Sequence, residues 1–361
     1  MAQRHMFPGN NTSIGFYSYY NHIVPRRESN RFFCLKGGPG TGKSTFMKKI
    51  ASGVGDAGFD VEFFRCSSDP DSLDGIFVPA LKAAVVDGTA PHIIDPISPG
   101  AVDEIINLGD YWDTRPIKDK KREIIQCGAE IKRLFKRAYK YMAAAKNIMD
   151  DITEIYDNAE NRAGAYIEAQ NIADAHFNNK PEGKLGKKRK LFATGVTPSG
   201  IISLADTLTD GSYKVYTVNH GFGGIVPQLL ASVSYEAFIR GIDAEIYYCP
   251  MAPEERIEHV IIPSLKLAVM SNNEAFNARG GTAIELDKYK NAALIDEQKA
   301  AVDFDMLSYK MLLNAAVASL KGAKELHDVL EGYYAPHMDF EKSDRKAKEV
   351  LNAILECSAR R

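Results

Sequence analysis

Residues 37–45 have the types and spacing of a phosphate-binding loop. They read Gly-Gly-Pro-Gly-Thr-Gly-Lys-Ser-Thr and fit the pattern G-x-x-x-x-G-K-[ST] at every specified position. Glycines let the backbone turn tightly and bring its N–H groups against phosphate oxygens. The lysine reaches the β- and γ-phosphates, and the serine hydroxyl ligates Mg²⁺. The predicted nucleotide-binding residues are Gly37, Gly38, Pro39, Gly40, Thr41, Gly42, Lys43, Ser44 and Thr45.

The flanking residues predict the elements that such a loop needs. Residues 31–35 form a short apolar and aromatic run typical of a buried strand, and residues 46–51 are typical of a helix. A loop that opens a helix offers the unpaired N–H groups and the positive dipole end of that helix to an anion. The alternative is a glycine-rich turn that carries a lysine by accident. We expect nucleotide binding.

The chain is a tandem duplication. Residues 58–66, GFDVEFFRC, return as residues 241–249, GIDAEIYYC, and residues 79–86 are echoed by residues 263–270. The offset of about 180 residues is far longer than a solenoid repeat, so we interpret the copies as two domains. We expect residues 1–180 to form a domain with the intact loop and a helical extension, and residues 186–361 to form a similar domain with a degenerate loop.

The expected fold class is α/β. Each copy is predicted to be a P-loop NTPase-type domain with a parallel sheet, the phosphate loop after its first strand, helices on both faces and helices appended at its C-terminal side. Residues 178–190 are polar, contain glycine and proline, and are interpreted as a linker. We interpret the basic cluster at the end of this linker as solvated.

The loop of the second copy lacks the residues that would bind phosphate and Mg²⁺. The repeat places Gly42 opposite Ile225, Lys43 opposite Val226 and Ser44 opposite Pro227. Valine cannot neutralise phosphate charge, and proline offers no ligand to Mg²⁺, although it suits a first helical turn. We expect the second copy to be inactive and either regulatory or structural. An anion nest at residues 221–224 remains open.

Comparison of the copies also selects candidate acids. Asp87 ends an apolar run, where a magnesium-organising carboxylate belongs, and its counterpart is Ser271. Asp69 falls opposite Ala252 and is predicted to orient water or to lie near Mg²⁺, the alternative being a carboxylate in a turn. The predicted catalytic residues are Lys43, Asp87 and Asp69, and the predicted magnesium ligands are Ser44 and Asp87.

Several other residues are weaker candidates. His92 lacks a counterpart and is a candidate sensor of the γ-phosphate. Arginines of the second copy are candidates for reaching across to the intact loop; they are Arg240, Arg256 and Arg279. The five cysteines have no C-x-x-C spacing, so we expect them to be reduced and to form neither a zinc site nor disulfides.

A long helical pattern begins near residue 117 and has an equivalent over residues 303–330, and a final helix is predicted over residues 343–356. Apolar residues recur along the first pattern at spacings of three and four. Its other side is basic and includes Lys132, Arg133, Lys136, Arg137, Lys140 and Lys146. We interpret this side as the solvated face of a helix docked to its own domain, with a surface for an acidic partner or nucleic acid as the alternative.

Composition indicates a globular protein of the cytoplasm. The chain has 361 residues, 45% of them hydrophobic, and a formal net charge of −2, which argues against bulk electrostatic capture of nucleic acid or anionic membrane. No apolar run approaches the roughly 20 residues of a membrane helix. The first residues lack the apolar core of a signal peptide, so we expect a cytoplasmic protein without a membrane partner.

The loop GGPGTGKST, the stretch FDVEFFRCSSDPDSLDG, the segment AAVVDGTAPH and the degenerate second copy together resemble a bacterial family of tandem-repeat P-loop ATPases. The resemblance spans nearly the whole chain. It implies binding of ATP with Mg²⁺ and hydrolysis in the first repeat, with GTP as a less favoured nucleotide because no N-K-x-D signal is present. Two alternatives stay open, a kinase for a nucleoside or other small metabolite, and a nucleotide-gated module that binds a protein or nucleic acid with negligible hydrolysis. A protein partner or a homo-oligomer is also open.

Overall fold

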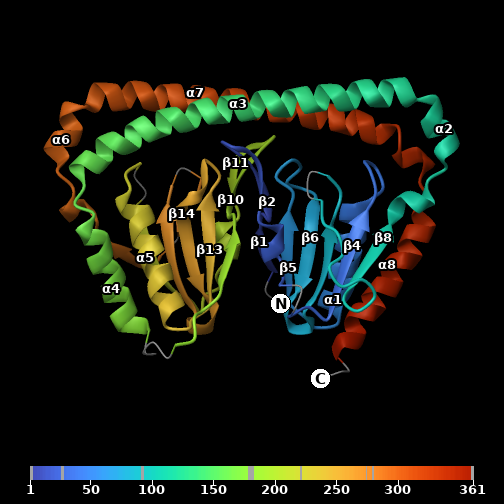
Figure 1. Cartoon of the computed structure of the whole chain (residues 1–361), viewed down its shortest axis with the longest axis horizontal. Coiled ribbons are helices and arrows are strands. Elements are labelled where there is room, and N and C mark those ends of the chain that lie inside the picture. Colours follow the sequence, from blue (N-terminus) through green and yellow to red (C-terminus); the bar gives the residue numbers. More distant parts are fainter. Residues whose placement is uncertain are drawn as a thin grey trace.

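The computed structural model describes residues 3–25, 28–90, 93–177, 183–219, 222–273, 275–278 and 280–358. It is an α/β protein with two similar halves, each built on a six-stranded sheet, and two long helices run across both halves (Figure 1). The α/β class and the duplication of the sheets agree with the sequence prediction.

The first sheet has the strand order β1-β5-β6-β7-β4-β8. Its strands are β1 (Gln3–Met6), β4 (Arg31–Lys36), β5 (Val61–Arg65), β6 (Leu73–Val78), β7 (Ala83–Asp87) and β8 (Asp103–Asn107). The second sheet repeats this order with β9 (Lys188–Leu191), β13 (Ala244–Cys249), β14 (Ala252–Ile262), β15 (Leu267–Asn272), β12 (Lys214–Asn219) and β16 (Thr282–Ile284). Each half adds a hairpin, β2 (Gly9–Thr12) with β3 (Gly15–Ser18) and β10 (Thr194–Thr197) with β11 (Gly200–Ser203).

The predicted all-parallel sheet is wrong at one strand in each half. Strand β6 is antiparallel to both β5 and β7, and β14 is antiparallel to both β13 and β15. The short segment 66–72 joins β5 to β6, and a parallel neighbour would need a crossover of about a dozen residues or more. The glycine-rich loop at residues 37–42 also does not follow the first strand of its sheet, because β1 precedes it and pairs with β5 at the sheet edge.

Within the described residues, α-helices cover one face of each sheet, which corrects the prediction of helices on both faces. Helices α1 (Lys43–Asp56) and α8 (Phe340–Leu355) pack on the face of the first sheet that carries Phe33 and Leu35. The opposite face carries Phe32 and Cys34, and these belong to one buried cluster with Tyr247 of the second sheet. The two sheets therefore turn their helix-free faces toward each other (Figure 1).

The two halves exchange helices. Helix α3 (Lys121–Ala159) follows the short α2 (Thr114–Asp119) and runs from the first half to the second, where α4 (Ala163–His176) packs on α5 (Ile225–Ile239). Helix α7 (Lys299–Gly332) follows α6 (Ala292–Glu297) and runs back along α3, and α8 then packs on α1 (Figure 1). The boundaries 1–180 and 186–361 thus separate the repeats along the chain, whereas each spatial half contains helices of both.

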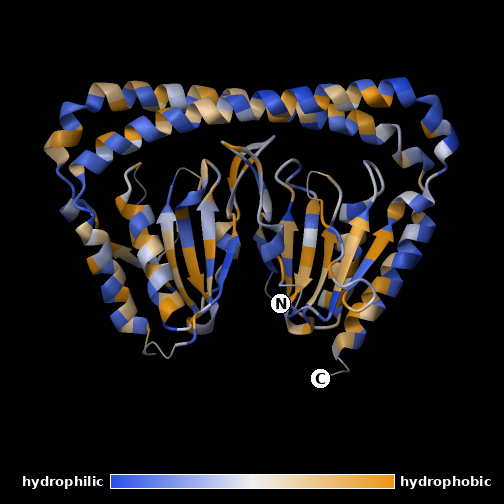
Figure 2. Ribbon diagram, viewed as in Figure 1, coloured by the Kyte–Doolittle hydropathy of each residue, from blue (hydrophilic) through white to orange (hydrophobic). Residues whose placement is uncertain are grey.

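This exchange corrects the expectation that the long basic helix docks to its own domain. Helix α3 packs mainly along α7 of the other repeat, and its contact with its own repeat is smaller, through Tyr139 and Asn11 of β2. The Sγ of Cys127 near its start contacts the carbonyl of Leu326. Of the six basic residues predicted to form this side of the helix, five are exposed, namely Lys132, Arg133, Lys136, Arg137 and Lys140, and Lys146 is half-buried. Figure 2 shows the mixed hydrophobic and hydrophilic colouring of α3 and α7. None of the helices in the described part of the chain is long and apolar enough to cross a membrane.

A symmetric cluster of four buried ions joins the halves. Arg4 and Arg189 are equivalent in the repeat, as are Glu62 and Glu245. Arg4 donates to Glu62 at 2.9 Å and also pairs with Glu245, while Arg189 donates to Glu62 at 2.6 Å and to Glu245 at 3.0 Å. Arg189 comes from the basic cluster that we expected to be solvated, so that expectation is wrong for this residue. The part of the linker at residues 178–182 lies outside the described residues.

Candidate functional site

The predicted strand, loop and helix around the glycine-rich stretch are confirmed. Residues 37–42 connect β4 to α1, and α1 begins at Lys43. Gly37, Gly40 and Gly42 have φ angles of 153°, 69° and 76°, in the region that residues with a side chain rarely adopt. The glycines are therefore needed for the backbone path, and the loop ends at the N-terminus of a helix.

Lys43 and Asp87 meet at the carboxyl ends of the neighbouring strands β4 and β7. The Nζ of Lys43 lies 3.6 Å from the Oδ2 of Asp87, and both side chains are largely buried. Lys43 also donates to the carbonyl oxygens of Gly37 at 2.8 Å and Gly38 at 3.2 Å. Thr89 donates through its backbone N to Asp87 at 2.8 Å and through its hydroxyl to Gly37 at 3.0 Å. A cation and a carboxylate are thus fixed beside the loop.

The three hydroxyl-bearing residues of the loop, Thr41, Ser44 and Thr45, differ in their contacts and burial. Ser44 is the second residue of α1, and its Oγ accepts a hydrogen bond from the backbone N of Leu73 at 3.1 Å. Thr41 donates to the carbonyl of Gly38 at 2.9 Å, whereas Thr45 is exposed. The hydroxyl of Ser44 therefore lies against the start of β6, one residue after Lys43 in the chain.

Asp69 lies in a turn and faces the second repeat. Its carboxylate accepts from the hydroxyl of Ser72 at 2.9 Å, and its carbonyl accepts from the backbone N of Ser72 at 2.8 Å. The Nζ of Lys324 in α7 lies 3.6 Å from its Oδ2. Within the described ranges, the carboxylate of Asp69 contacts Ser72 and Lys324 and not Lys43 or Asp87. The turn that we had considered as the alternative is present.

Of the weaker candidates, the two arginines that the structure describes contact groups of the second repeat. His92, Gly221 and Arg279 lie outside the described residues. Arg240 pairs with Glu236 near the end of α5, and Arg256 donates to the carbonyl of Phe222 at 2.9 Å. All five cysteines are free, as predicted; they are Cys34, Cys66, Cys127, Cys249 and Cys357.

A buried carboxylate near the site was missed by the sequence analysis. Asp74 lies on β6, and β6 is the neighbour of the strand that ends in Asp87. Burial, and secondarily the charge of Asp74, raises the pKa values of the Tyr20 hydroxyl and the Cys66 thiol well above their ordinary values. Comparison of the two repeats could have found this residue. Asp74 aligns with Glu258, so both copies have an acidic residue at the same position of an otherwise largely apolar stretch.

Residues near the junction of α7 and α8 cover the outside of the phosphate loop. The Oε1 of Glu331 accepts a hydrogen bond from the backbone N of Gly40 at 3.3 Å. A Cβ atom on Gly40 would lie 2.9 Å from the backbone N of Ala335, and one on Gly42 would lie 3.2 Å from the ring of Phe340. The loop of the first repeat is thus packed against residues of the second.

The degenerate loop is covered in the same way by the end of α3. The backbone N of Gly224 donates to the Oδ1 of Asp157 at 2.7 Å, and the backbone N of Ile225 donates to the Oε2 of Glu160 at 2.9 Å. Burial raises the pKa of Glu160, although the bond from Ile225 opposes this effect. A Cβ atom on Gly223 would lie 2.2 Å from the Oε1 of Glu160. The N–H groups at the start of α5 therefore hold carboxylates of the chain itself.

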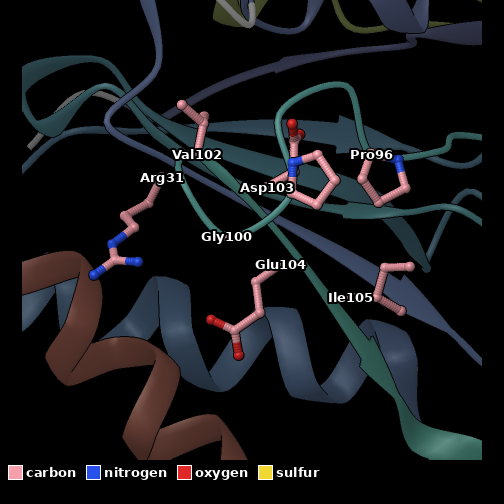
Figure 3. Close-up of a pocket in the computed structure, with 8 residues that line it drawn as sticks. Arg31, Pro96, Gly100, Val102, Asp103, Glu104 and Ile105 are labelled. Atoms are coloured by element: carbon pink, nitrogen blue, oxygen red, sulfur yellow. The ribbon is translucent and has the colours of Figure 1, made fainter.

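Two surface depressions lie away from the phosphate loop. One of about 460 Å³ surrounds the start of β8, between Arg31, Pro96 and Glu104 (Figure 3). Since Arg31 begins β4 and the loop follows the last residue of that strand, this depression and the loop lie at opposite ends of β4. The other, of about 540 Å³, lies in the second half between Tyr166, Tyr235 and Tyr248.

Comparisons of the chain with protein-family models, with curated proteins and with solved structures found no match.

Proposed function

We propose that the first repeat binds ATP with Mg²⁺ at residues 37–45 and hydrolyses it. The observation that carries this proposal is the placement of Lys43 at the start of α1, 3.6 Å from Asp87, at the end of a glycine loop. The resemblance to tandem-repeat P-loop ATPases supports the choice of adenine and of hydrolysis. The second repeat, which has Val226 in place of the lysine, is proposed to bind no nucleotide.

Each residue has a physical role in this proposal. The loop N–H groups and Lys43 bind the phosphates, and Lys43 exchanges its bonds to the Gly37 and Gly38 carbonyls for phosphate oxygens. The hydroxyl of Ser44 and the carboxylate of Asp87 are hard oxygen donors of the kind that Mg²⁺ prefers. When bound there, Mg²⁺ neutralises charge on the terminal phosphates. The contacts of Asp69 with Lys324 and Ser72 favour a role in docking α7 over the predicted role in orienting water.

Replacement of the loop lysine tests this function. We expect Lys43→Ala to lower ATP turnover by about 10²- to 10³-fold or more, because one buried cation that stabilises the transferring phosphoryl group is lost. Lys48→Ala is the matched control, since Lys48 is an exposed lysine of the same helix whose Nζ contacts the carbonyl of Asp71. Phosphate release measures turnover, and calorimetry with ATP and Mg²⁺ counts the binding sites.

One calorimetric site in the wild-type protein and none in Lys43→Ala would agree with the proposal. Unchanged phosphate release in Lys43→Ala would overturn the assignment of the site. A second nucleotide site would instead contradict the inactive role of the second repeat.

A further inference from the structure

Both glycine loops receive carboxylates from the opposite repeat. In the second half, Asp157 and Glu160 from the end of α3 and just beyond it accept hydrogen bonds from the backbone N of Gly224 and Ile225. In the first half, Glu331 from the end of α7 accepts from the backbone N of Gly40. The long helices α3 and α7 thus end in the same way, each with an anionic side chain on the loop of the other repeat.

The two contacts differ in strength. The second loop holds two carboxylates at 2.7 and 2.9 Å, and Asp157 is also paired with Arg162. The first loop holds one carboxylate at 3.3 Å, and the side chain of Glu331 is 45% exposed. Charge-assisted hydrogen bonds weaken as they lengthen and as water competes for the groups. The bond of Glu331 is therefore the one that a ligand can replace.

Gly40 is also one of the residues whose N–H groups face phosphate in a loop of this pattern. A phosphate oxygen and the Glu331 carboxylate would compete for the same donor, and their negative charges would repel each other at this distance. The first loop has Lys43 to hold the phosphate, whereas the second has only Val226 at that position.

We propose that Glu331 is an internal competitor of the nucleotide, and that phosphate binding at the first loop displaces it and loosens the junction of α7 and α8 from the loop. This proposal rests on nucleotide binding by the first repeat. Asp157 and Glu160 act differently, because they keep α3 attached to the second loop whether or not nucleotide is bound. The chain therefore has one exchangeable and one permanent contact between a long helix and a glycine loop.

The only tryptophan of the chain reports on this junction. A Cβ atom on Gly38 would lie 3.0 Å from the ring of Trp112, and the ring centroids of Trp112 and Tyr334 are 5.2 Å apart. Trp112 thus contacts both the loop and the segment that follows α7. A movement of this segment would change the surroundings of the indole and its fluorescence.

The test uses the full-length protein, ATP with Mg²⁺, and the variants Glu331→Gln and Glu325→Gln. Both variants remove one negative charge from α7, but Glu325 is exposed and lies away from the loop residues that Glu331 contacts. We expect Glu331→Gln to bind ATP about three- to tenfold more tightly by calorimetry, and Glu325→Gln to bind like the wild-type protein. We also expect ATP to change Trp112 fluorescence, with half the change at a lower concentration in Glu331→Gln.

The outcomes separate this proposal from the proposed function. Equal ATP affinity in Glu331→Gln and wild type would overturn the competition while leaving nucleotide binding in place. Binding without any change in Trp112 fluorescence would overturn the loosening of the junction. Binding by Glu331→Gln alone would support the competition. No binding by either protein would overturn both the competition and the proposed function.

Discussion

At the scale of single residues, the neighbours of a buried carboxylate decide its charge. Burial by itself would raise the pKa of Glu245, but the guanidinium groups of Arg4 and Arg189 lower it to about 2. Glu258 is equally buried, and burial raises its pKa to about 7, although a hydrogen bond from Thr194 opposes the shift. Glu245 is therefore ionised at neutral pH, whereas Glu258 keeps its proton to a much higher pH than an ordinary glutamate does.

The raised pKa of Glu258 predicts a pH dependence of stability. Its value in the folded protein, about 7, exceeds the ordinary value of 4.5, so the folded state binds more protons than the unfolded state between these two values. The free energy of unfolding should fall as pH rises from about 4.5 to 7, by about 3 kcal/mol from this group. Urea denaturation of wild type and Glu258→Gln at pH 5 and pH 7.5 measures the difference.

In Glu258→Gln this part of the pH dependence should be absent. The difference in free energy of unfolding between wild type and Glu258→Gln should therefore change between pH 5 and pH 7.5. Glu255→Gln, which removes an exposed carboxylate of the same strand, is the control and should retain the wild-type dependence. Parallel curves for wild type and Glu258→Gln would show that Glu258 titrates normally.

At the scale of elements, each repeat completes the core of the other. Helix α8 buries Val350 and Ile354 against the apolar face of α1, although α1 belongs to the first repeat. The two helices approach closely at Gly53, where a Cβ atom would lie 2.3 Å from the Cδ2 of Leu351. The helix that carries Lys43 and Ser44 therefore depends on the last helix of the described chain for its packing.

Truncation of a buried side chain on α8 should loosen α1, the helix that carries Lys43. Ile354 is fully buried, and we expect Ile354→Ala to lower the free energy of unfolding by about 2 to 5 kcal/mol, because it removes apolar contact and leaves a cavity. Hydrogen exchange should become faster along α1 in this variant. Lys348→Ala, on the exposed side of the same helix, is the control. Unchanged exchange in α1 would contradict the dependence of α1 on α8.

At the scale of the whole molecule, the chain is built like a dimer of two fused subunits. The four-ion cluster of Arg4, Glu62, Arg189 and Glu245 pairs each repeat with the other, and α3 lies along α7. The facing sheets add a shared apolar core. The two repeats are therefore held together by shared ion pairs and shared cores as well as by the peptide connection after α4.

Cleavage of the connection between the two repeats should leave the repeats associated. A protease site inserted between Phe177 and Gly183 would separate the repeats covalently after α4. We expect the two fragments to elute as one particle in gel filtration, because each fragment holds a helix that packs in the half of the other. In denaturant the same fragments should separate. Fragments that separate under native conditions would show that the exchanged helices contribute little to association.

Local chemistry and periodicity were predictable from the sequence. The phosphate loop depends on a few adjacent residues, and the strand and helix around it depend on short-range patterns, so β4, α1 and the position of Asp87 at the end of β7 were anticipated. The duplication was visible because it is a comparison of the chain with itself. The length of α3 is also informative. Its 39 residues span about 58 Å, which is longer than one small domain and indicates a helix that reaches beyond its own repeat.

The tertiary structure alone decided which copy each helix packs on. An apolar pattern along α4 or α8 does not say which copy the helix packs on, and the directions of α3 and α7 carry each of them to the opposite one. The same directions bring Lys324 to Asp69 and Glu331 to Gly40. Contacts between residues almost 300 positions apart leave no pattern along a chain, because they depend on the three-dimensional path of every element between them.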